Sequence, residues 1–356
     1  MSSNGVDNRP DHGAGDEPIL ARRAVTKPVP KKQKKRWLRT TLVVLGVLIT
    51  LLMAAAAIIG WFGWRLASTF DDESEVIPDA FPTTQAPERD DGAQTILLLG
   101  SDTRGTIDTE DIEGPQDARS DTIMVARIPA DHSAIYIMSI MRDSWVDIPG
   151  YGDAKINAAL AYGGTPLAIE TVESLIGSRI DHVAMIDFEG FKGLTDALGG
   201  VPVYNTQAFS AGGHNFPQGS LMLNGSEALS FVRERKSFED GDYQRVRNQQ
   251  AYMKGLLSTI LSRETLTSPS KLTATVDAIS PFIARDSGLD GGYIAGQAMK
   301  MTSIRPSDIH FFTAPTAGVG WSPDGRQSII ELDWTEMAKV KEAFETDTVA
   351  GLVGAY

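Results

Sequence analysis

Residues 182–204 read HVAMIDFEGFKGLTDALGGVPVY, and this stretch decides the class of fold. Its first five residues are mostly apolar and β-rich, which predicts a strand over 182–186. The next segment predicts a helix over 188–197, ended by the glycine pair 199–200. Residues 201–204 then predict a second strand. A strand, a helix and a strand in direct succession are typical of a sheet that is covered by helices.

The same alternation continues outward in both directions. Apolar, β-rich runs predict further strands over 95–99, 122–128, 134–140, 309–313 and 329–332. Helical spacing predicts helices over 155–162, 166–175, 224–233, 242–262 and 334–345, with two weaker ones before about residue 301. We therefore expect an α/β fold whose sheet has helices on both faces.

Charge is distributed unevenly along the 356 residues, whose net charge is −13. Residues 1–39 hold ten Lys/Arg and four Asp/Glu, and the next 25 residues, 40–64, carry no charge. A helix of that length spans roughly 37 Å, and a bilayer core needs about 30 Å. Basic residues precede this segment and acidic residues follow it. The positive-inside rule then predicts a cytoplasmic N-terminus and an extracytoplasmic remainder.

Two other interpretations of the N-terminus are weaker. A cleaved signal peptide has a shorter apolar region and a small-residue cleavage site, whereas Trp61, Phe62 and Trp64 end this one. A nucleic-acid site in the basic cluster is disfavoured, because the rest of the chain is acidic. We predict a disordered cytoplasmic tail, a transmembrane helix, an extracytoplasmic stalk and a catalytic domain over 1–39, 40–64, 65–93 and 94–356.

Composition excludes several kinds of site. The chain has no cysteine, which rules out a disulfide scaffold, a thiolate zinc site and a cysteine nucleophile. Its five histidines lack metal-ligand spacing: His12, His132, His182, His214 and His310. The motifs GxxxxGK[ST], GxGxxG and GxSxG are absent, which disfavours nucleotide-driven and serine-esterase chemistry.

Two acidic motifs flank one predicted hairpin. Asp102 lies in the GSDTR motif at 100–104, directly after the strand 95–99, and Asp121 directly precedes the strand 122–128. If these strands pair as a hairpin, the two carboxylates meet at one edge and need a cation or proton between them. Oxygen ligands without histidine favour Mg²⁺ over zinc. A polar turn with solvated acids, including an Arg119–Asp121 surface pair, is the alternative.

Arginines gather in three further places. Arg142 follows the strand 134–140, where α/β folds place ligand-facing residues, although a surface arginine would fit the position as well. The stretch SFVRERK at 230–236 and the stretch DGDYQRVRNQQ at 240–250 are the densest. Helical spacing places Asp242, Arg245 and Gln249 on one face, which is either a solvated surface or part of a site. Clustered arginines in an acidic chain favour an anion site, because their planar forks suit phosphate.

In this order, the motifs resemble those of the LytR-CpsA-Psr (LCP) family of cell-wall glycopolymer ligases. The resemblance covers about residues 94–265 and includes the single N-terminal membrane helix. It is carried by LLLGSDTR, ARSDTIM, SIMRDSWVDIPG, KINAALAYGG, LNGSEALSFVRERK and DGDYQRVRNQQ. The resemblance implies a central mixed β-sheet with helices on both faces, preceded by one transmembrane helix.

The resemblance also implies an activity, namely transfer of a glycopolymer from a polyprenyl-pyrophosphate donor to a hydroxyl of peptidoglycan. The metal ligands it implies for Mg²⁺ are Asp102 and Asp121. The pyrophosphate-binding residues it implies are Arg119, Arg142, Arg233, Arg235, Arg245 and Gln249. The catalytic residues it implies are Arg119, Arg142, Asp242 and Arg245. If Arg233 and Arg235 both face one phosphate, the helix 224–233 must end near Arg233 and the chain must straighten there, because helical residues two apart point away from each other.

Two alternatives stay open at the level of sequence. One is a non-catalytic wall protein that binds the lipid or the glycopolymer, and the other is a pyrophosphatase that hydrolyses the same donor. The candidates for the general base are Asp102 and Asp242.

Overall fold

The structure, a computed structural model, describes residues 33–83, 92–101 and 120–356. The chain divides into two units, residues 1–58 and 59–356. Helix α1 (Gln33–Glu73) begins in the first unit and ends in the second. Among the described residues it is the one helix long and apolar enough to cross a membrane, with its candidate span at Val44–Glu73.

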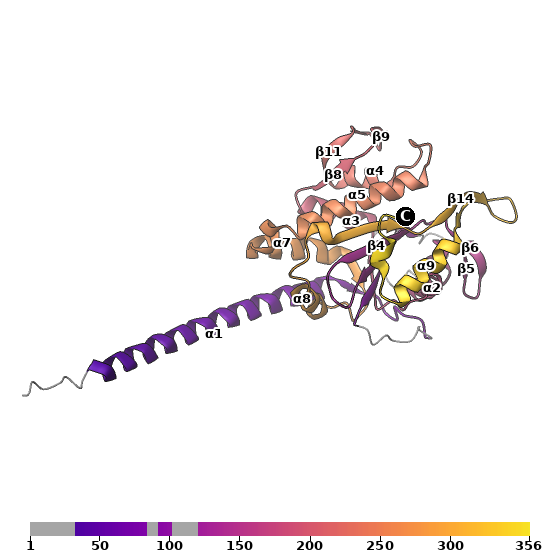
Figure 1. The fold of residues 1–356 in the computed structure, drawn as a ribbon. Coiled ribbons are helices and arrows are strands. Elements are labelled where there is room, and N and C mark those ends of the chain that lie inside the picture. Colours follow the sequence, from indigo (N-terminus) through magenta and orange to yellow (C-terminus); the bar gives the residue numbers. More distant parts are fainter. Residues whose placement is uncertain (1–32, 84–91, 102–119) are drawn as a thin grey trace, which may run out of the picture. The chain divides into compact units, whose positions relative to one another are not determined.

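A mixed sheet forms the centre of the second unit (Figure 1). In the described residues it has seven strands, in the order β1-β12-β7-β2-β3-β4-β13. Their bounds are β1 (Glu75–Val76), β12 (Ile283–Arg285), β7 (His182–Ile186), β2 (Gln94–Ser101), β3 (Ser120–Ile128), β4 (Ile135–Ile140) and β13 (Ile309–Thr313). Strands β2 and β3 pair as the predicted antiparallel hairpin, and β2 pairs with β7 in parallel.

Alternation along the strands gives the sheet two apolar faces. Leu97, Val125 and Met138 are aligned across three neighbouring strands and are fully buried in one core. Their neighbours Met124 and Ile137 belong to a second core on the opposite face. Because successive strand residues point to opposite faces, apolar runs without alternating polar residues require helices on both sides.

Helices supply these two covers (Figure 1). The first face packs against α2 (Ala158–Ile176) and α9 (Trp334–Glu345). The second face packs against α5 (Asp242–Ile260), which also holds α3 (Phe188–Ala197) and α4 (Gly225–Arg233) in a third core. The other α-helices in the part of the chain that the structure describes are α6 (Arg263–Leu266), α7 (Pro269–Ile279) and α8 (Gly291–Lys300). The predicted two-sided α/β sheet is confirmed.

Short two-stranded sheets accompany the central sheet. In the described residues they are β5 (Trp145–Ile148) with β6 (Gly152–Lys155), β8 (Val201–Asn205) with β11 (Gly219–Leu223), β9 (Phe209–Ala211) with β10 (His214–Phe216), and β14 (Thr316–Trp321) with β15 (Ser328–Leu332). The first pair was not predicted and ends at Lys155, so the predicted helix 155–162 begins only at Ala158. It merges with the predicted helix 166–175 across a kink at Gly163 and Gly164, where Gly164 has a φ of 64°.

The end of α1 is built into the second unit. Asp71 pairs with Arg285 of β12 at 2.7 Å and accepts the backbone N–H of Gly291 at 2.8 Å. β1 pairs with β12, and Ile77 is buried in the core. Residues up to 83 thus belong to the folded unit, which differs from the stalk predicted over 65–93. Pro78 and Asp79, although exposed, lie between the buried side chains of Ile77 and Ala80.

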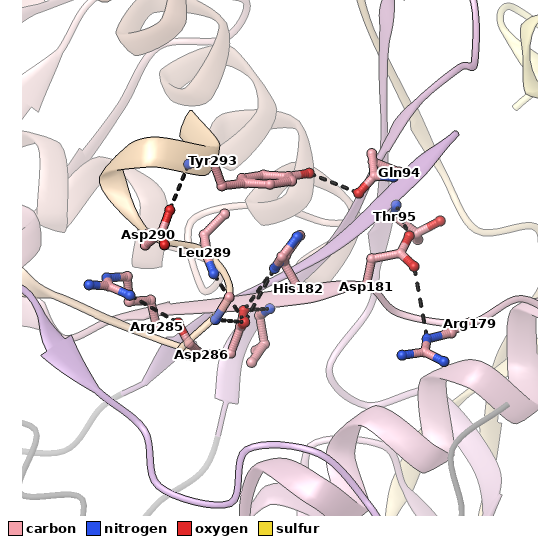
Figure 2. A network of polar contacts seen from close by, with 12 residues as sticks. Gln94, Thr95, Arg179, Asp181, His182, Arg285, Asp286, Leu289, Asp290 and Tyr293 are labelled. Carbon is pink, nitrogen blue, oxygen red and sulfur yellow. Dashed lines mark hydrogen bonds and ion pairs between the residues drawn. The ribbon is translucent and has the colours of Figure 1, made fainter. Parts of the chain in front are cut away.

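A polar network fixes the turn that follows β12 (Figure 2). The Asp286 carboxylate accepts backbone N–H groups from Val183, Gly288 and Leu289 at 2.7–3.1 Å. His182 Nδ1 lies 3.2 Å from the same carboxylate, and the His182 ring packs on Tyr293 with centroids 4.1 Å apart. The network joins β7, β12 and α8, and the last two of these elements also contact the end of α1.

Candidate active site

The carboxyl ends of several strands meet at one edge of the sheet. β2 runs parallel to β7, and two antiparallel pairings make β4 run in the same direction as β2. Arg142 follows β4, and Asp187 follows β7. Ligands of open α/β sheets bind at this edge, because loops after neighbouring strands meet there.

A cavity of about 300 Å³ opens at this edge. It brings together most of the charged and amide side chains that the motifs pointed to. These are Asp121, Arg142, Arg233, Arg235, Arg245 and Gln249. They come from β3, the loop after β4, the end of α4 and the first half of α5, so the fold collects residues that are more than 120 positions apart in the chain.

Most of the remaining cavity wall is apolar, although Thr122 and Asp187 also line it. Strand β2 and helices α3, α4 and α5 contribute Leu98, Phe188, Phe191, Leu229 and Met253. The cavity therefore has a cationic end and an apolar end. This combination suits an amphiphile with an anionic head and a hydrocarbon tail.

Arg142 lies among carboxylates at the cationic end. Its Nη1 pairs with Asp121, its Nε lies 3.8 Å from Asp143, and its side chain is only 19% exposed. Burial lowers the pKa of Arg142, but the two carboxylates outweigh burial and raise that pKa overall. Among the described residues, the buried Nε atoms of Arg142 and Arg245 have no hydrogen-bond partner. Buried donors of this kind are costly unless a ligand satisfies them.

The chain straightens between the two arginines of the RER motif, as predicted. α4 ends at Arg233, and Glu234 has extended backbone angles, with a φ of −67° and a ψ of 132°. Two amides of α5 end the helix by donating to its last carbonyls, Asn248 to Phe231 at 3.2 Å and Gln249 to Val232 at 3.4 Å. As a result, both arginines line the same cavity. Arg233 also lies over a ring, with its Cζ 4.2 Å from the centroid of Phe188.

Asp242 sits behind the cavity as a partner of its arginines. Its carboxylate lies 3.2 Å from Arg245 and 3.8 Å from Arg235. Burial raises the pKa of Asp242, and a hydrogen bond shared with the Asp143 carboxyl raises it further, against the opposing charge of Arg245. Burial would raise the pKa of Asp143 too, but that hydrogen bond, Arg142 and Lys155 lower it overall.

Two of the predicted site residues, Asp102 and Arg119, lie outside the described residues. The described part of the chain holds no group of three or more His, Cys, Asp or Glu side chains arranged for a metal. Asp121 is the one predicted metal ligand that the structure places, and its half-buried carboxylate lines the cavity. An oxygen ligand in that position suits a hard cation such as Mg²⁺.

The structure also adds residues to the site that carried no assigned role. Asp143 stands beside Arg142 in the sequence, but contacts from distant residues place it in the site. Its Oδ1 lies 3.2 Å from Lys155 Nζ, and its carboxyl shares a hydrogen bond with Asp242. The side-chain amide of Asn248 donates a hydrogen bond to the Phe231 carbonyl of α4. Adjacency to Arg142 is the one local signal that pointed to Asp143.

Known proteins resemble this chain in sequence and in fold. The cell wall biosynthesis protein LcpA of Corynebacterium glutamicum is 34% identical over 68% of this chain and 54% of its own length. A polyisoprenyl-teichoic acid–peptidoglycan teichoic acid transferase TagU of Enterococcus faecalis is 32% identical over 70% of this chain and 79% of its own. The chain thus spans about half of the first of these relatives. The crystal structure of B. subtilis TagV is 24% identical, covers 73% of this chain and has a TM-score of 0.62, which shows a shared fold.

The family assignment rests on more than single relatives. Residues 65–346 match the LytR_cpsA_psr family as a whole. The matched range contains the complete central sheet and every described residue that lines the cavity. This chain belongs to the LytR_cpsA_psr family.

Proposed function

We propose that this chain is an extracytoplasmic phosphotransferase that moves a glycopolymer from a polyprenyl-pyrophosphate donor to a hydroxyl of peptidoglycan. The observation that carries the proposal is the cavity with two unlike ends, in which buried arginine donors without partners adjoin an apolar wall. The pyrophosphate occupies the cationic end and the polyprenyl chain the apolar end. The names of the relatives, which include a teichoic acid transferase, support the same class of reaction.

The residues act mainly by binding and charge neutralisation. Oxygens of the pyrophosphate accept hydrogen bonds from Arg142 and Arg245, whose Nε atoms otherwise have no partner. Arg233 and Arg235 bind the same group from the end of α4. Fixed cations around a transferring phosphoryl group stabilise the charge that develops on it. Asp242 orients Arg245 and Arg235 from behind.

Mg²⁺ is part of the proposal. Asp121, together with Asp102, would hold the ion, which would supply further neutralisation of phosphate charge. The carboxylate of Asp121 pairs with Arg142 in this structure, so the ion would bind a carboxylate that also contacts this arginine. We expect activity to disappear on chelation and to return on addition of Mg²⁺.

The full chain in detergent, a lipid-linked glycopolymer and peptidoglycan test the proposal. Mass spectrometry should detect a phosphodiester-linked glycan on peptidoglycan together with free polyprenyl phosphate. Arg245→Ala should abolish the product, whereas Arg326→Ala, an 84% exposed arginine in the turn after β14, should not. A free phospho-glycan as the sole product would identify a pyrophosphatase, and an intact donor would identify a binding protein. Either result contradicts the proposal.

A further inference from the structure

A second cavity adjoins the first and has a different character. Its volume is about 570 Å³, and it shares Arg142 and Arg235 with the first cavity. None of the apolar residues from β2, α3, α4 or α5 that wall the first cavity lines it. Its polar lining includes Asp143, Lys155 and Asn157. A polar cavity that meets the same arginines suits a hydrophilic reactant.

An exposed aromatic pair stands beside this cavity. Tyr162, which lines the cavity, stacks on Tyr151 with ring centroids 4.9 Å apart. The Tyr151 hydroxyl donates to the Tyr162 carbonyl at 3.0 Å, which fixes the pair. The rings nevertheless remain 57% and 47% exposed. Rigid exposed tyrosines present an apolar face and a polar edge at little entropic cost, and such surfaces mark sites of binding.

Asp143 is placed to receive a proton in the second cavity. It lines this cavity and not the first, and its side chain is 14% exposed. Lys155 and Arg142 hold it in place from two sides, at 3.2 Å and 3.8 Å. A general base must lie within hydrogen-bond reach of the proton it takes, and this carboxylate opens on the polar side of Arg142.

The geometry of phosphoryl transfer separates the two reactants. The attacking and leaving oxygens lie roughly in line on opposite sides of phosphorus. With the polyprenyl phosphate leaving group in the apolar cavity, the acceptor oxygen must arrive from the side away from the apolar wall. The second cavity meets this requirement, because it reaches Arg142 and Arg235 without sharing that wall.

We propose that the second cavity binds the acceptor saccharide, which stacks on Tyr151 and Tyr162 and presents one hydroxyl to Asp143. The proposal rests on the proposed function. The hydroxyl oxygen forms a bond to the phosphorus next to the glycan, and the bond from this phosphorus to the bridging oxygen breaks. Polyprenyl phosphate leaves with the electron pair, and the hydroxyl proton passes to the Asp143 carboxylate.

Initial rates with the full chain in detergent test the aromatic pair. The probe is a soluble peptidoglycan glycan oligomer, varied at saturating donor and then held constant while the donor is varied. Tyr162→Ala and Tyr151→Ala should each raise the KM for the acceptor about 10-fold, as loss of one aromatic contact implies. The donor KM and kcat should stay within about twofold, since neither ring lines the donor cavity.

Tyr204→Ala is the matched control. Tyr204 is 63% exposed on β8 and lines neither of the two cavities that meet at Arg142, so both KM values should match the wild type. Asp143→Asn tests the proton acceptor. It should lower kcat about 10²–10⁴-fold while the KM for the acceptor stays nearly unchanged. Thermal unfolding of each variant reports whether it is folded.

The outcomes separate this proposal from the proposed function. If the wild type transfers glycan and both tyrosine variants keep the wild-type acceptor KM, the acceptor lies elsewhere and only the present proposal fails. An Asp143→Asn enzyme with wild-type kcat removes Asp143 from the reaction. If the wild type forms no glycan–peptidoglycan product at all, the proposed function itself fails.

Discussion

At the scale of single residues, Arg142 has two tasks in the proposed reaction, because it neutralises Asp121 and Asp143 and would also bind a phosphate. Arg142→Lys keeps the positive charge beside Asp121 and Asp143 but loses the planar fork. We expect kcat to fall about 10²-fold with little change in melting temperature. The exposed Arg326→Lys should leave both values unchanged. A wild-type rate in Arg142→Lys would show that a point charge suffices at this position.

Asp286 makes stability depend on pH in a defined direction. Burial raises the pKa of this carboxyl, but hydrogen bonds from His182, Val183 and Gly288 lower it overall, below the usual 3.8. A depressed pKa adds stability above the unfolded value, and that stability is lost as pH falls below 3.8 towards the folded value.

Asp286→Asn should therefore reduce the free energy of unfolding by about 3 kcal/mol at pH 7, since buried hydrogen bonds to a charge are lost. The difference from wild type should shrink at pH values below 3.8. Urea unfolding of the detergent-solubilised chain at several pH values measures it. Asp324→Asn is the control, because Asp324 is also hydrogen-bonded but exposed. A difference between Asp286→Asn and wild type that is independent of pH would contradict the assignment.

At the scale of elements, the contact between α1 and α8 depends on one glycine. A Cβ atom added at Gly291 would lie 2.4 Å from the Ala67 carbonyl oxygen and 2.5 Å from its Cα, so backbone would have to move. Gly291→Ala should destabilise the protein by about 1–3 kcal/mol. Gly296→Ala lies in the same helix with nothing within 4 Å of its new Cβ, and should be neutral or stabilise by up to about 1 kcal/mol. The melting temperature should therefore fall in Gly291→Ala and stay unchanged or rise in Gly296→Ala.

Elements with a strong local pattern were predictable to the residue. The strand 182–186, the helix 188–197, the strand 309–313 and the helix 334–345 have the bounds expected from apolar spacing and helix-ending glycines. The end of α4 followed from a different argument, since one anion can meet Arg233 and Arg235 together only if the chain straightens between them.

Other features could not be predicted because their cause is not local. β6 has exposed or half-exposed residues throughout, so it lacks the apolar alternation that signals a strand. β12 is three residues long and is defined by pairing with β7, about a hundred residues earlier. Asp143 acquires its role from Asp242 in the same way. In each case the partner comes from a distant part of the chain, and a single sequence does not reveal it.

At the scale of the whole molecule, the membrane topology is testable. The charge asymmetry around α1 predicts a cytoplasmic N-terminus and an extracytoplasmic catalytic unit. Protease added to intact, wall-stripped cells should digest residues 94–356 and spare an epitope placed before Thr40. Permeabilised cells, in which both ends are digested, are the control. Protection of 94–356 in intact cells would place the unit in the cytoplasm, away from its proposed acceptor.

The two cavities that meet at Arg142 and Arg235 also bear on fidelity. If the donor binds in the apolar cavity as proposed, its reacting phosphorus faces the second, polar cavity before the acceptor binds. Water fits such a space, and hydrolysis then competes with transfer. We expect the ratio of transfer to hydrolysis to depend on how fully the second cavity is occupied. A saccharide stacked on Tyr151 and Tyr162 would exclude the water that hydrolyses the donor. Specificity for the acceptor would thus be kinetic, because a bound saccharide occupies the space from which water would attack.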